Sequence, residues 1–210
     1  MALKYQRILL KISGEALGGE KGMGFDEPTM DAICGGVKKA HELGVQIGIV
    51  VGGGNFWRGR SSGKMERTLA DKIGMLATVM NALAVSDKLE QLGVETEVFT
   101  SITMPQVAPA FTRKDALKAM ADGKIAIFGG GTGNPFFTTD TAGALRAIEI
   151  VESCLNFFAS VSKNDSTSRM FATPAPQTRC AILQILGIPR IRITAPLSLQ
   201  RISNTQHPSR

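Results

Sequence analysis

Three short apolar runs in this chain each lead into a glycine-containing bend, and this repetition constrains the fold more than any other feature. The runs lie at residues 7–12, 45–51 and 124–128, and each is rich in isoleucine, leucine or valine. Continuous apolar runs bounded by glycine are typical of strands buried on both faces of a parallel sheet. In such sheets ligands bind beyond the carboxyl ends of the strands, which is where these bends are expected.

Stretches with helical spacing of apolar residues separate these runs. Helices are expected over residues 26–44, 65–92, 114–120 and 139–150, and a further strand over 96–100. Asp26 is a candidate N-cap of the first helix, and Thr139 or Asp140 of the last. The alternation of strands and helices predicts an α/β fold built around a mainly parallel sheet.

The composition changes abruptly after residue 150. Residues 1–150 carry 17 Lys and Arg against 16 Asp and Glu, a net charge of +1, whereas residues 151–210 carry 7 against 2, a net charge of +5. Of the 23 glycines, 22 lie in the first part. We expect a main domain at 1–150 and a divergent basic segment at 151–210. The cations of that segment are dispersed and lack tyrosine or tryptophan, which argues against a nucleic-acid partner.

Composition also excludes several other classes of protein. A hydrophobic fraction of 43% argues against a disordered chain. No apolar run approaches the roughly 18 residues of a membrane span, and no signal-peptide pattern follows the first residues, so a cytoplasmic protein without a membrane partner is expected. Cys34, Cys154 and Cys180 are too few and too scattered for a disulfide framework or a zinc site, and no metal-binding residues are predicted.

Glycine-rich bends allow backbone N–H groups to approach an anion because no Cβ atom stands in the way. A single bend of this kind is more often a simple tight turn, but three after successive strands indicate a phosphorylated ligand. Familiar motifs fail on spacing: Gly59-Arg-Ser-Ser-Gly63-Lys64 is one residue short of a Walker A loop, and no G-x-G-x-x-G opens a helix. Two histidines support no convincing Ser/His/Asp triad.

Three charged residues near these bends are candidates for phosphate chemistry. Lys11 lies near the end of the first run, either as an edge-strand lysine that points to solvent or as a cation that bridges phosphates. Arg58 follows the second bend, as a solvated loop arginine or as a second cation of that kind. Asp71 lies in the long helix, as a surface carboxylate or, if its face turns toward the bends, as an acceptor for sugar hydroxyls.

The segment at 132–140, Thr-Gly-Asn-Pro-Phe-Phe-Thr-Thr-Asp, is the most informative part of the third bend. Asn134 and the threonines offer donors and acceptors, and Pro135 stiffens the turn. Phe136 and Phe137 either pack in the core, which is commoner for phenylalanine, or offer a face to a ring. The combination of polar loop residues and paired aromatics favours a nucleotide.

Four motifs resemble those of the bacterial uridylate (UMP) kinases in the amino-acid kinase family. They are Arg7-Ile-Leu-Leu-Lys-Ile-Ser-Gly-Glu-Ala16, Gly52-Gly-Gly-Asn-Phe-Trp-Arg-Gly59, Gly74-Met-Leu-Ala-Thr-Val-Met-Asn81 and Gly131-Thr-Gly-Asn-Pro-Phe-Phe-Thr-Thr-Asp140. They occur in the family's order over about residues 4–150. The resemblance implies a three-layer αβα sandwich with a mainly parallel sheet. It also implies phosphoryl transfer from ATP to UMP, giving UDP and ADP, with Mg²⁺ accompanying ATP.

The resemblance also assigns roles to individual residues. The catalytic positions are matched by Lys11, Arg58 and Asp140. The ATP positions are matched by Lys11, Ile12, Ser13, Gly14, Gly54 and Arg58. The UMP positions are matched by Gly53, Asp71, Thr132, Gly133, Asn134, Pro135, Phe136, Phe137, Thr138 and Thr139. The segment linked to activation by GTP is matched by Gly19, Glu20, Lys21, Gly22, Met23 and Gly24. Inhibition by UTP and a homohexamer are implied as well.

The resemblance ends after Ile150. The family continues with an acidic strand, a lysine-containing loop, a Val-Asp-Gly segment and an Asp-Pro step, which hold the adenine and ribose of ATP and which residues 151–210 lack. Our hypothesis for this loss is a shifted reading frame or another replaced C-terminus, and true divergence with strands near 181–186 and 188–193 is the alternative. Two functional hypotheses follow: a UMP kinase, or a catalytically impaired protein that keeps the UMP site but lacks a complete ATP site.

Overall fold

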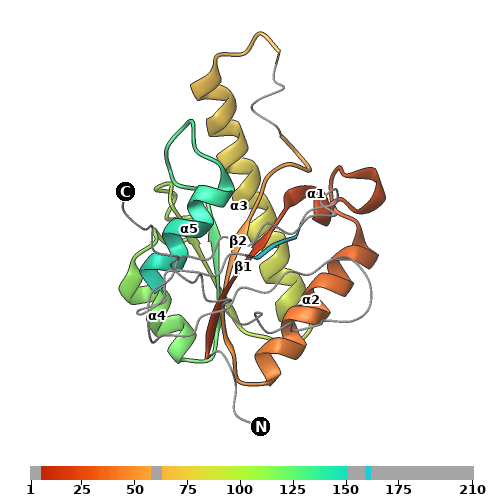
Figure 1. The fold of residues 1–210 in the computed structure, drawn as a ribbon, viewed down its shortest axis with the longest axis vertical. Helices are drawn as coiled ribbons and strands as arrows, with labels where there is room; N and C mark the ends of the chain where they lie inside the picture. The colour runs from red at the N-terminus through yellow and green to blue at the C-terminus, as the bar shows by residue number, and fades with distance from the viewer. Residues whose placement is uncertain (1–5, 58–62, 151–158, 162–210) are drawn as a thin grey trace, which may run out of the picture.

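The computed structural model describes residues 6–57, 63–150 and 159–161, in which strands and helices alternate (Figure 1). The strands are β1 (Arg7–Ile12), β2 (Gln46–Val51), β3 (Thr96–Thr100), β4 (Ile125–Gly129) and β5 (Ala159–Val161). The helices are α1 (Gly14–Leu17), η1 (Gly19–Lys21), α2 (Glu27–Glu42), α3 (Arg67–Gln91), α4 (Arg113–Ala121) and α5 (Thr139–Ile150). The strands and helices expected between residues 7 and 150 are present, and α1, η1 and β5 are additional short elements.

The strands form one sheet in the order β3-β4-β2-β1-β5, and every pairing is parallel. The mainly parallel sheet expected from the sequence is therefore confirmed. The strands that lead into the three bends, β4, β2 and β1, are neighbours in this order. Because the carboxyl ends of parallel strands lie at one edge of a sheet, the bends emerge side by side there, at the upper end of the molecule in Figure 1.

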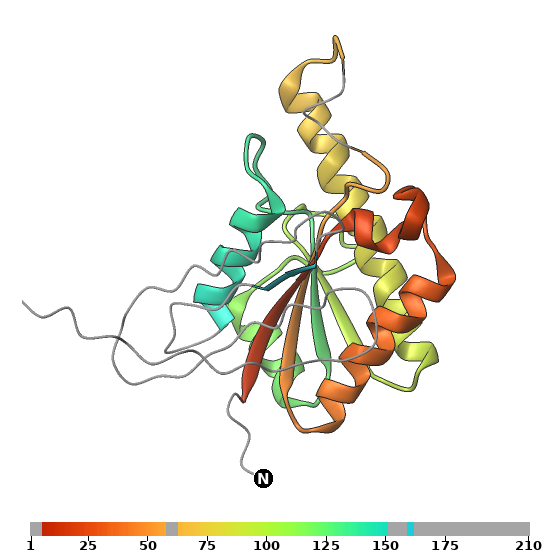
Figure 2. The same cartoon turned by 45° about the vertical axis from the view of Figure 1, so that its right-hand side comes forward.

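Helices cover both faces of the sheet, which confirms the expected three-layer αβα sandwich (Figure 2). On one face α2 and α3 pack against Leu10, Ile49 and Ile127, all at most 2% exposed. On the other face α4 and α5 pack against alternate strand residues such as Leu9 and Phe128. Successive strand residues point to opposite faces, so two apolar clusters account for the nearly continuous apolar strands.

Asp26 begins α2, as the sequence predicts. Its Oδ2 accepts a hydrogen bond from the Thr29 backbone N–H at 3.0 Å and another from the Thr29 hydroxyl. These bonds favour the charged carboxylate and lower the pKa of Asp26 below its ordinary value. The folded state therefore gains stability from this cap above the ordinary pKa of an aspartate, and loses it as the pH falls through the lowered value.

The start of α5 differs from the expected one. The helix begins at Thr139, and the Thr138 hydroxyl accepts a hydrogen bond from the Thr141 backbone N–H at 3.3 Å. Thr139 and Asp140 are already inside the first helical turn, so the prediction that one of them caps the helix was wrong. Asp140 instead directs its carboxylate toward β1, where it meets Lys11.

The helix α3 is long and apolar enough, by length and composition, to cross a membrane, and 39% of its apolar window is buried. The expectation that no stretch approaches membrane length was based on uninterrupted apolar runs and did not identify this helix. α3 packs against β2, β3, β4 and α2, as a core helix does, and its first turns extend beyond the sheet edge (Figure 2). Length and composition are therefore weak evidence for a membrane span here.

Replacing Ile127 by alanine should destabilise the fold strongly, because Ile127 in β4 is 0% exposed and belongs to the larger cluster. We expect the free energy of unfolding to fall by about 2–5 kcal/mol in urea denaturation followed by circular dichroism. Ile148→Ala, at a position 56% exposed on α5, is the matched control and should change little. Similar losses in the two variants would contradict the described core.

Candidate functional site

The bends after β1 and β2 contact one another directly. The Gly52 N–H donates to the Ile12 carbonyl at 2.8 Å, which holds the second bend against the end of β1. A Cβ atom on Gly14 would lie 2.5 Å from the Gly54 backbone nitrogen and 2.7 Å from the Gly52 carbonyl oxygen. Since no side chain fits there, glycine at position 14 is what allows the two backbones to approach this closely.

A pair of buried asparagines fixes the second bend to α3. The Asn81 side chain, 0% exposed, donates from Nδ2 to the Gly52 carbonyl at 2.5 Å. Asn81 and Asn55 also exchange hydrogen bonds between their amides, at 2.6 and 3.1 Å. Each buried amide is therefore satisfied, and the geometry of the bend is set by side chains as well as by the backbone.

The segment at 19–24 meets the second bend through the same asparagine. The Gly24 N–H donates to the Asn55 carbonyl at 3.1 Å, and Asn55 Nδ2 donates to the Gly24 carbonyl at 2.7 Å. Earlier in the segment, residues 19–21 form η1, Gly22 ends it in the left-handed region, and Met23 is 76% exposed. This surface segment is thus connected to the bends by two hydrogen bonds.

The third bend, after β4, is held by side chains from two other elements. The Gly130 N–H donates to Thr78 Oγ1 in α3 at 2.7 Å. Ser101, just after β3, donates from Oγ to the Gly131 carbonyl at 2.9 Å. Gly130, Gly131 and Gly133 have φ angles of 81°, 59° and 77°, in the left-handed region that favours glycine. The glycines allow this path, and Thr78 and Ser101 fix it.

Lys11 is buried near the carboxyl end of β1 and pairs with Asp140. The lysine side chain is 11% exposed, and Nζ lies 3.1 Å from Oδ1 of Asp140. The alternative of an edge-strand lysine that points to solvent is wrong, because β1 lies between β2 and β5. The Asp140 side chain is 59% exposed, so the pair opens toward solvent on the side of α5. The fold thus places a cationic side chain at the edge where the bends meet.

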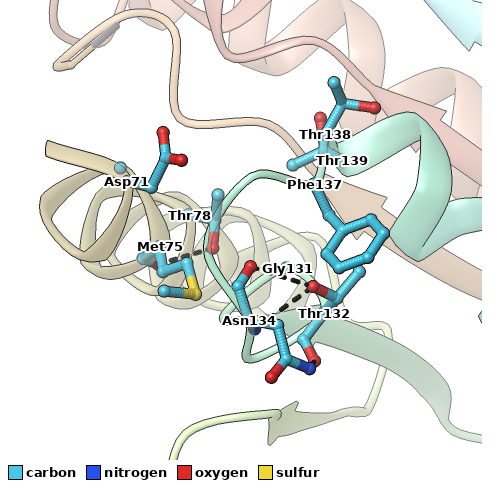
Figure 3. Close-up of a pocket in the computed structure, with 10 residues that line it drawn as sticks. Asp71, Met75, Thr78, Gly131, Thr132, Asn134, Phe137, Thr138 and Thr139 are labelled. Carbon is cyan, nitrogen blue, oxygen red and sulfur yellow. Dashed lines mark hydrogen bonds between the residues drawn. The ribbon is translucent and has the colours of Figure 1, made fainter. Parts of the chain in front are cut away.

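A cavity of about 130 Å³ lies between α3 and the segment after β4 (Figure 3). α3 contributes Asp71, Met75 and Thr78, which lie on one helical face at the spacing of successive turns. The segment after β4 contributes hydroxyl and amide side chains and one aromatic ring. The ten lining residues are Asp71, Gly74, Met75, Thr78, Gly131, Thr132, Asn134, Phe137, Thr138 and Thr139.

Asp71 joins α3 to the loop across the cavity. Its Oδ2 accepts hydrogen bonds from Arg67 Nε and from the Phe136 backbone N–H, both at 2.8 Å. The Asp71 side chain is 14% exposed and lines the cavity, so the alternative of an ordinary surface carboxylate is wrong. Arg67 also lies over the Phe136 ring, with Cζ 5.8 Å from the ring centroid. Asp71 and Arg67 together hold the tip of the loop.

The two phenylalanines of the loop are exposed, at 62% for Phe136 and 59% for Phe137. The alternative that they pack in the core is therefore wrong. Phe136 has a φ angle of 71°, an uncommon conformation for an aromatic residue, and its bond to Asp71 helps to hold it there. Phe137 lines the cavity, whereas Gly133, Pro135 and Phe136 belong to the loop without lining it.

Other residues with a predicted role, Gly53 and Gly54, lie in the second bend and do not line the cavity. A Cβ atom on Gly53 would lie 2.9 Å from Ala77 Cβ, so this glycine packs directly on α3. A Cβ atom on Gly54 would lie 3.0 Å from Glu15 Oε1 in α1. Arg58, predicted as a catalytic and ATP-binding residue, lies outside the described residues.

Four further lining residues carried no predicted role: Gly74, Met75, Thr78 and Gly131. Helical spacing from Asp71 places residues 74, 75 and 78 on the same face of α3, so this periodicity was the signal that could have identified them. Arg67 also precedes Asp71 by one helical turn, but its position over an aromatic ring depends on a contact distant in the sequence.

Comparisons with known proteins cover the same region. Residues 6–163 match the sequence model of the amino acid kinase family, and this range includes β5. A UMP kinase structure from Bacillus anthracis is 35% identical, with a TM-score of 0.71, over 77% of this chain and 66% of that one. A UMP kinase structure from Ureaplasma parvum is 34% identical, with a TM-score of 0.69, over 75% and 69%. The chain thus spans 66% and 69% of the lengths of these two proteins. By this match and by its fold, the chain belongs to the amino acid kinase family.

Proposed function

We propose that this chain binds UMP and ATP and transfers the γ-phosphoryl group between them, giving UDP and ADP, as a cytoplasmic enzyme of pyrimidine nucleotide biosynthesis. The observation that carries the proposal is that Lys11, a buried lysine, pairs with Asp140 at the edge where three glycine bends meet. The identity of 34–35% to two UMP kinases supports the choice of nucleotide.

The chemistry of the cavity suits a nucleoside monophosphate. The Asp71 carboxylate is an acceptor for ribose hydroxyls, and the amide of Asn134 offers a donor and an acceptor to the edge of a pyrimidine. The Phe137 ring offers an apolar face to the base. Thr138 and Thr139, at the start of α5, offer hydroxyls where the positive end of the helix favours an anion.

The reaction needs positioning and positive charge rather than a covalent intermediate. In phosphoryl transfer, charge is spread over the oxygens of the moving group, and fixed donors lower the barrier by stabilising it. Lys11 supplies such a donor, and Asp140 orients it in the absence of substrate. The backbone amides of the bends at Gly14 and Gly54 supply further donors that need no reorganisation.

Mg²⁺ enters this proposal together with ATP. In phosphoryl-transfer sites Mg²⁺ usually keeps waters and is bound through one or two carboxylates and the substrate phosphates. Within the described ranges, no group of three or more His, Cys, Asp or Glu side chains gathers as a site of its own. Asp140 offers one exposed carboxylate next to Lys11, which fits a cation carried by the nucleotide. When bound, Mg²⁺ would neutralise phosphate charge there.

A second candidate is a protein that binds UMP without turning it over. The observation that favours it is that residues 151–210 lack the motifs that the resemblance places around the adenine and ribose of ATP. Formation of ADP and binding of UMP, measured on the same preparation, distinguish the two functions.

Control by GTP and UTP and assembly into homohexamers extend the proposal. The two hydrogen bonds between Gly24 and Asn55 support the first extension, because they connect a surface segment to a phosphate-binding bend. Exposed apolar side chains on α3 support self-association: Leu76 is 47% exposed, Met80 49% and Leu83 39%.

Replacing Lys11 by alanine should remove most UMP-dependent formation of ADP from Mg-ATP, measured by a coupled assay. Loss of one donor to the developing charge costs about 10²–10³ in kcat. Lys118→Ala is the matched control, because Lys118 also pairs with a carboxylate but lies on α4, outside the cavity. Turnover by Lys11→Ala equal to that of the wild type would contradict the role of Lys11. UMP binding by a wild type without turnover would favour the second candidate.

Trp57 provides a reporter for binding in the cavity. It is the single tryptophan of the chain, and its indole N–H donates to the Ala70 carbonyl at 2.8 Å. Its Cδ1 lies 3.7 Å from where a Cβ atom on Gly74, a lining residue, would stand. A nucleotide in the cavity should therefore change the fluorescence of this one side chain.

Asp71→Asn keeps the size of the side chain but removes its charge, and should weaken UMP binding followed by Trp57 fluorescence. Hydrogen bonds to a charged group contribute enough that a loss of affinity of about tenfold or more is expected. Asp87→Asn, on the same helix but bonded to Gln91, should bind UMP like the wild type. Equal affinities in all three proteins would show that Asp71 does not contact the ligand.

A further inference from the structure

Arg146 is a buried cation that the proposed phosphoryl transfer does not use. It lies in α5, is 7% exposed, and has its Cζ 3.7 Å from the centroid of the Phe111 ring. Its Nη1 pairs with Glu149, but its Nε is buried without a hydrogen-bond partner. Burying an incompletely bonded guanidinium costs free energy, so this charge calls for an explanation beyond packing.

The remaining contact of Arg146 leads to the cavity wall. Its Nη2 donates to Ser101 Oγ at 3.4 Å, and Ser101 Oγ donates to the carbonyl of Gly131 at 2.9 Å. A guanidinium can only donate hydrogen bonds, so the hydrogen of the Ser101 hydroxyl is directed away from it and onto Gly131. Two hydrogen bonds in sequence thus connect α5 to a residue that lines the cavity.

Gly131 lies in a part of the loop whose conformation depends on hydrogen bonds from residues outside the loop. Glycine can adopt the left-handed conformations of Gly130, Gly131 and Gly133, but it can adopt many other backbone conformations as well. Glycine alone therefore does not hold the loop in this path. Thr78 holds the N–H of Gly130, and the carbonyl of Gly130 holds the N–H of Gly133 at 3.0 Å. Ser101 fixes the carbonyl between them.

We propose that Arg146 is a positioning residue for the nucleotide cavity, and that it acts through Ser101 to keep the loop at Gly131 in the conformation that accepts a nucleoside monophosphate. The identity of the ligand rests on the proposed function, whereas the effect on the loop does not. Phe111 packs edge-on against Phe99 and Phe128, so the ring on which Arg146 stacks is itself packed against the core. The loop therefore takes its position from the sheet.

The test uses Arg146→Met, Ser101→Ala and the double variant in the full chain. Methionine has a similar reach but no donors, and alanine removes the hydroxyl. Hydrogen–deuterium exchange of the peptide at 129–138 without ligand measures the loop, and UMP titration followed by Trp57 measures the site. Each single variant should exchange faster in this peptide and bind UMP about tenfold more weakly. The double variant should bind UMP as tightly, and exchange as slowly, as the more affected of the two single variants. Both substitutions break the same chain of contacts, so their effects should not add.

Arg113→Met is the matched control. Arg113 is an exposed arginine on α4 that also bonds to α5, through the Glu149 carbonyl at 2.6 Å. Its loss removes an arginine and a contact to the same helix, so it should leave loop exchange and UMP affinity unchanged even where stability falls.

If Arg146→Met shows the loop exchange and the UMP affinity of the wild type, the inference is overturned, whatever the change in its free energy of unfolding. Arg146 would then have a purely structural role. If Arg146→Met does not fold, the same result in Ser101→Ala would overturn it. A wild type that gives no response to UMP would overturn the proposed function, and loop exchange alone would then decide the inference.

Discussion

The parallel order of β4, β2 and β1 is the constraint on which the site depends. Each of these strands ends at the same edge, so three bends that are distant in the sequence share one small volume. Their closeness is possible because Gly14 has no side chain to separate the first two backbones. Lys11 lies within β1, one residue before its end. The same sheet that brings the bends together therefore also places the lysine cation next to them. Charge and backbone donors are thus brought together by strand pairing before any ligand binds.

The bends differ in how they are supported. The first and second bends contact each other directly, and the buried pair Asn55 and Asn81 holds the second bend against α3. The hydrogen bonds of this pair join buried groups to one another. The third depends on three single side chains, Thr78 and Asp71 from α3 and Ser101 just after β3. A loop held at separate points can adapt between them, whereas the paired bends leave little freedom. This division suits the proposed site, in which the paired bends would hold phosphates and the loop after β4 would contact a base and a sugar.

The sequence predicted the layers of this fold well because apolar periodicity is a local property: the runs at 7–12 and 45–51 and the long stretch at 65–92 each carry their own signal. It also placed candidate binding residues in the third bend, and five of them, Thr132, Asn134, Phe137, Thr138 and Thr139, line the cavity. It did not predict the contacts that place the segment, since the bond from Asp71 to Phe136 and the stacking of Arg146 on Phe111 join positions far apart in the chain. For a related reason the sequence did not decide whether Phe136 and Phe137 are buried or exposed. The exposure of a side chain depends on which other residues the fold places next to it.

The sheet order also bears on how binding and transfer can be separated in this chain. β5 is the edge strand next to β1, and Ser160 pairs in register with Lys11. The cavity lies instead between α3 and the segment after β4, with β2 separating β4 from β1. Removal of β5 would thus turn β1 into an edge strand and expose the environment of Lys11, while Asp71 and Thr78 would keep their neighbours. A change beyond Ile150 would therefore affect the surroundings of Lys11, the lysine proposed for phosphoryl transfer, more directly than the site proposed for UMP. The strand order thus gives a physical reason why UMP binding could persist without turnover, as in the second candidate function.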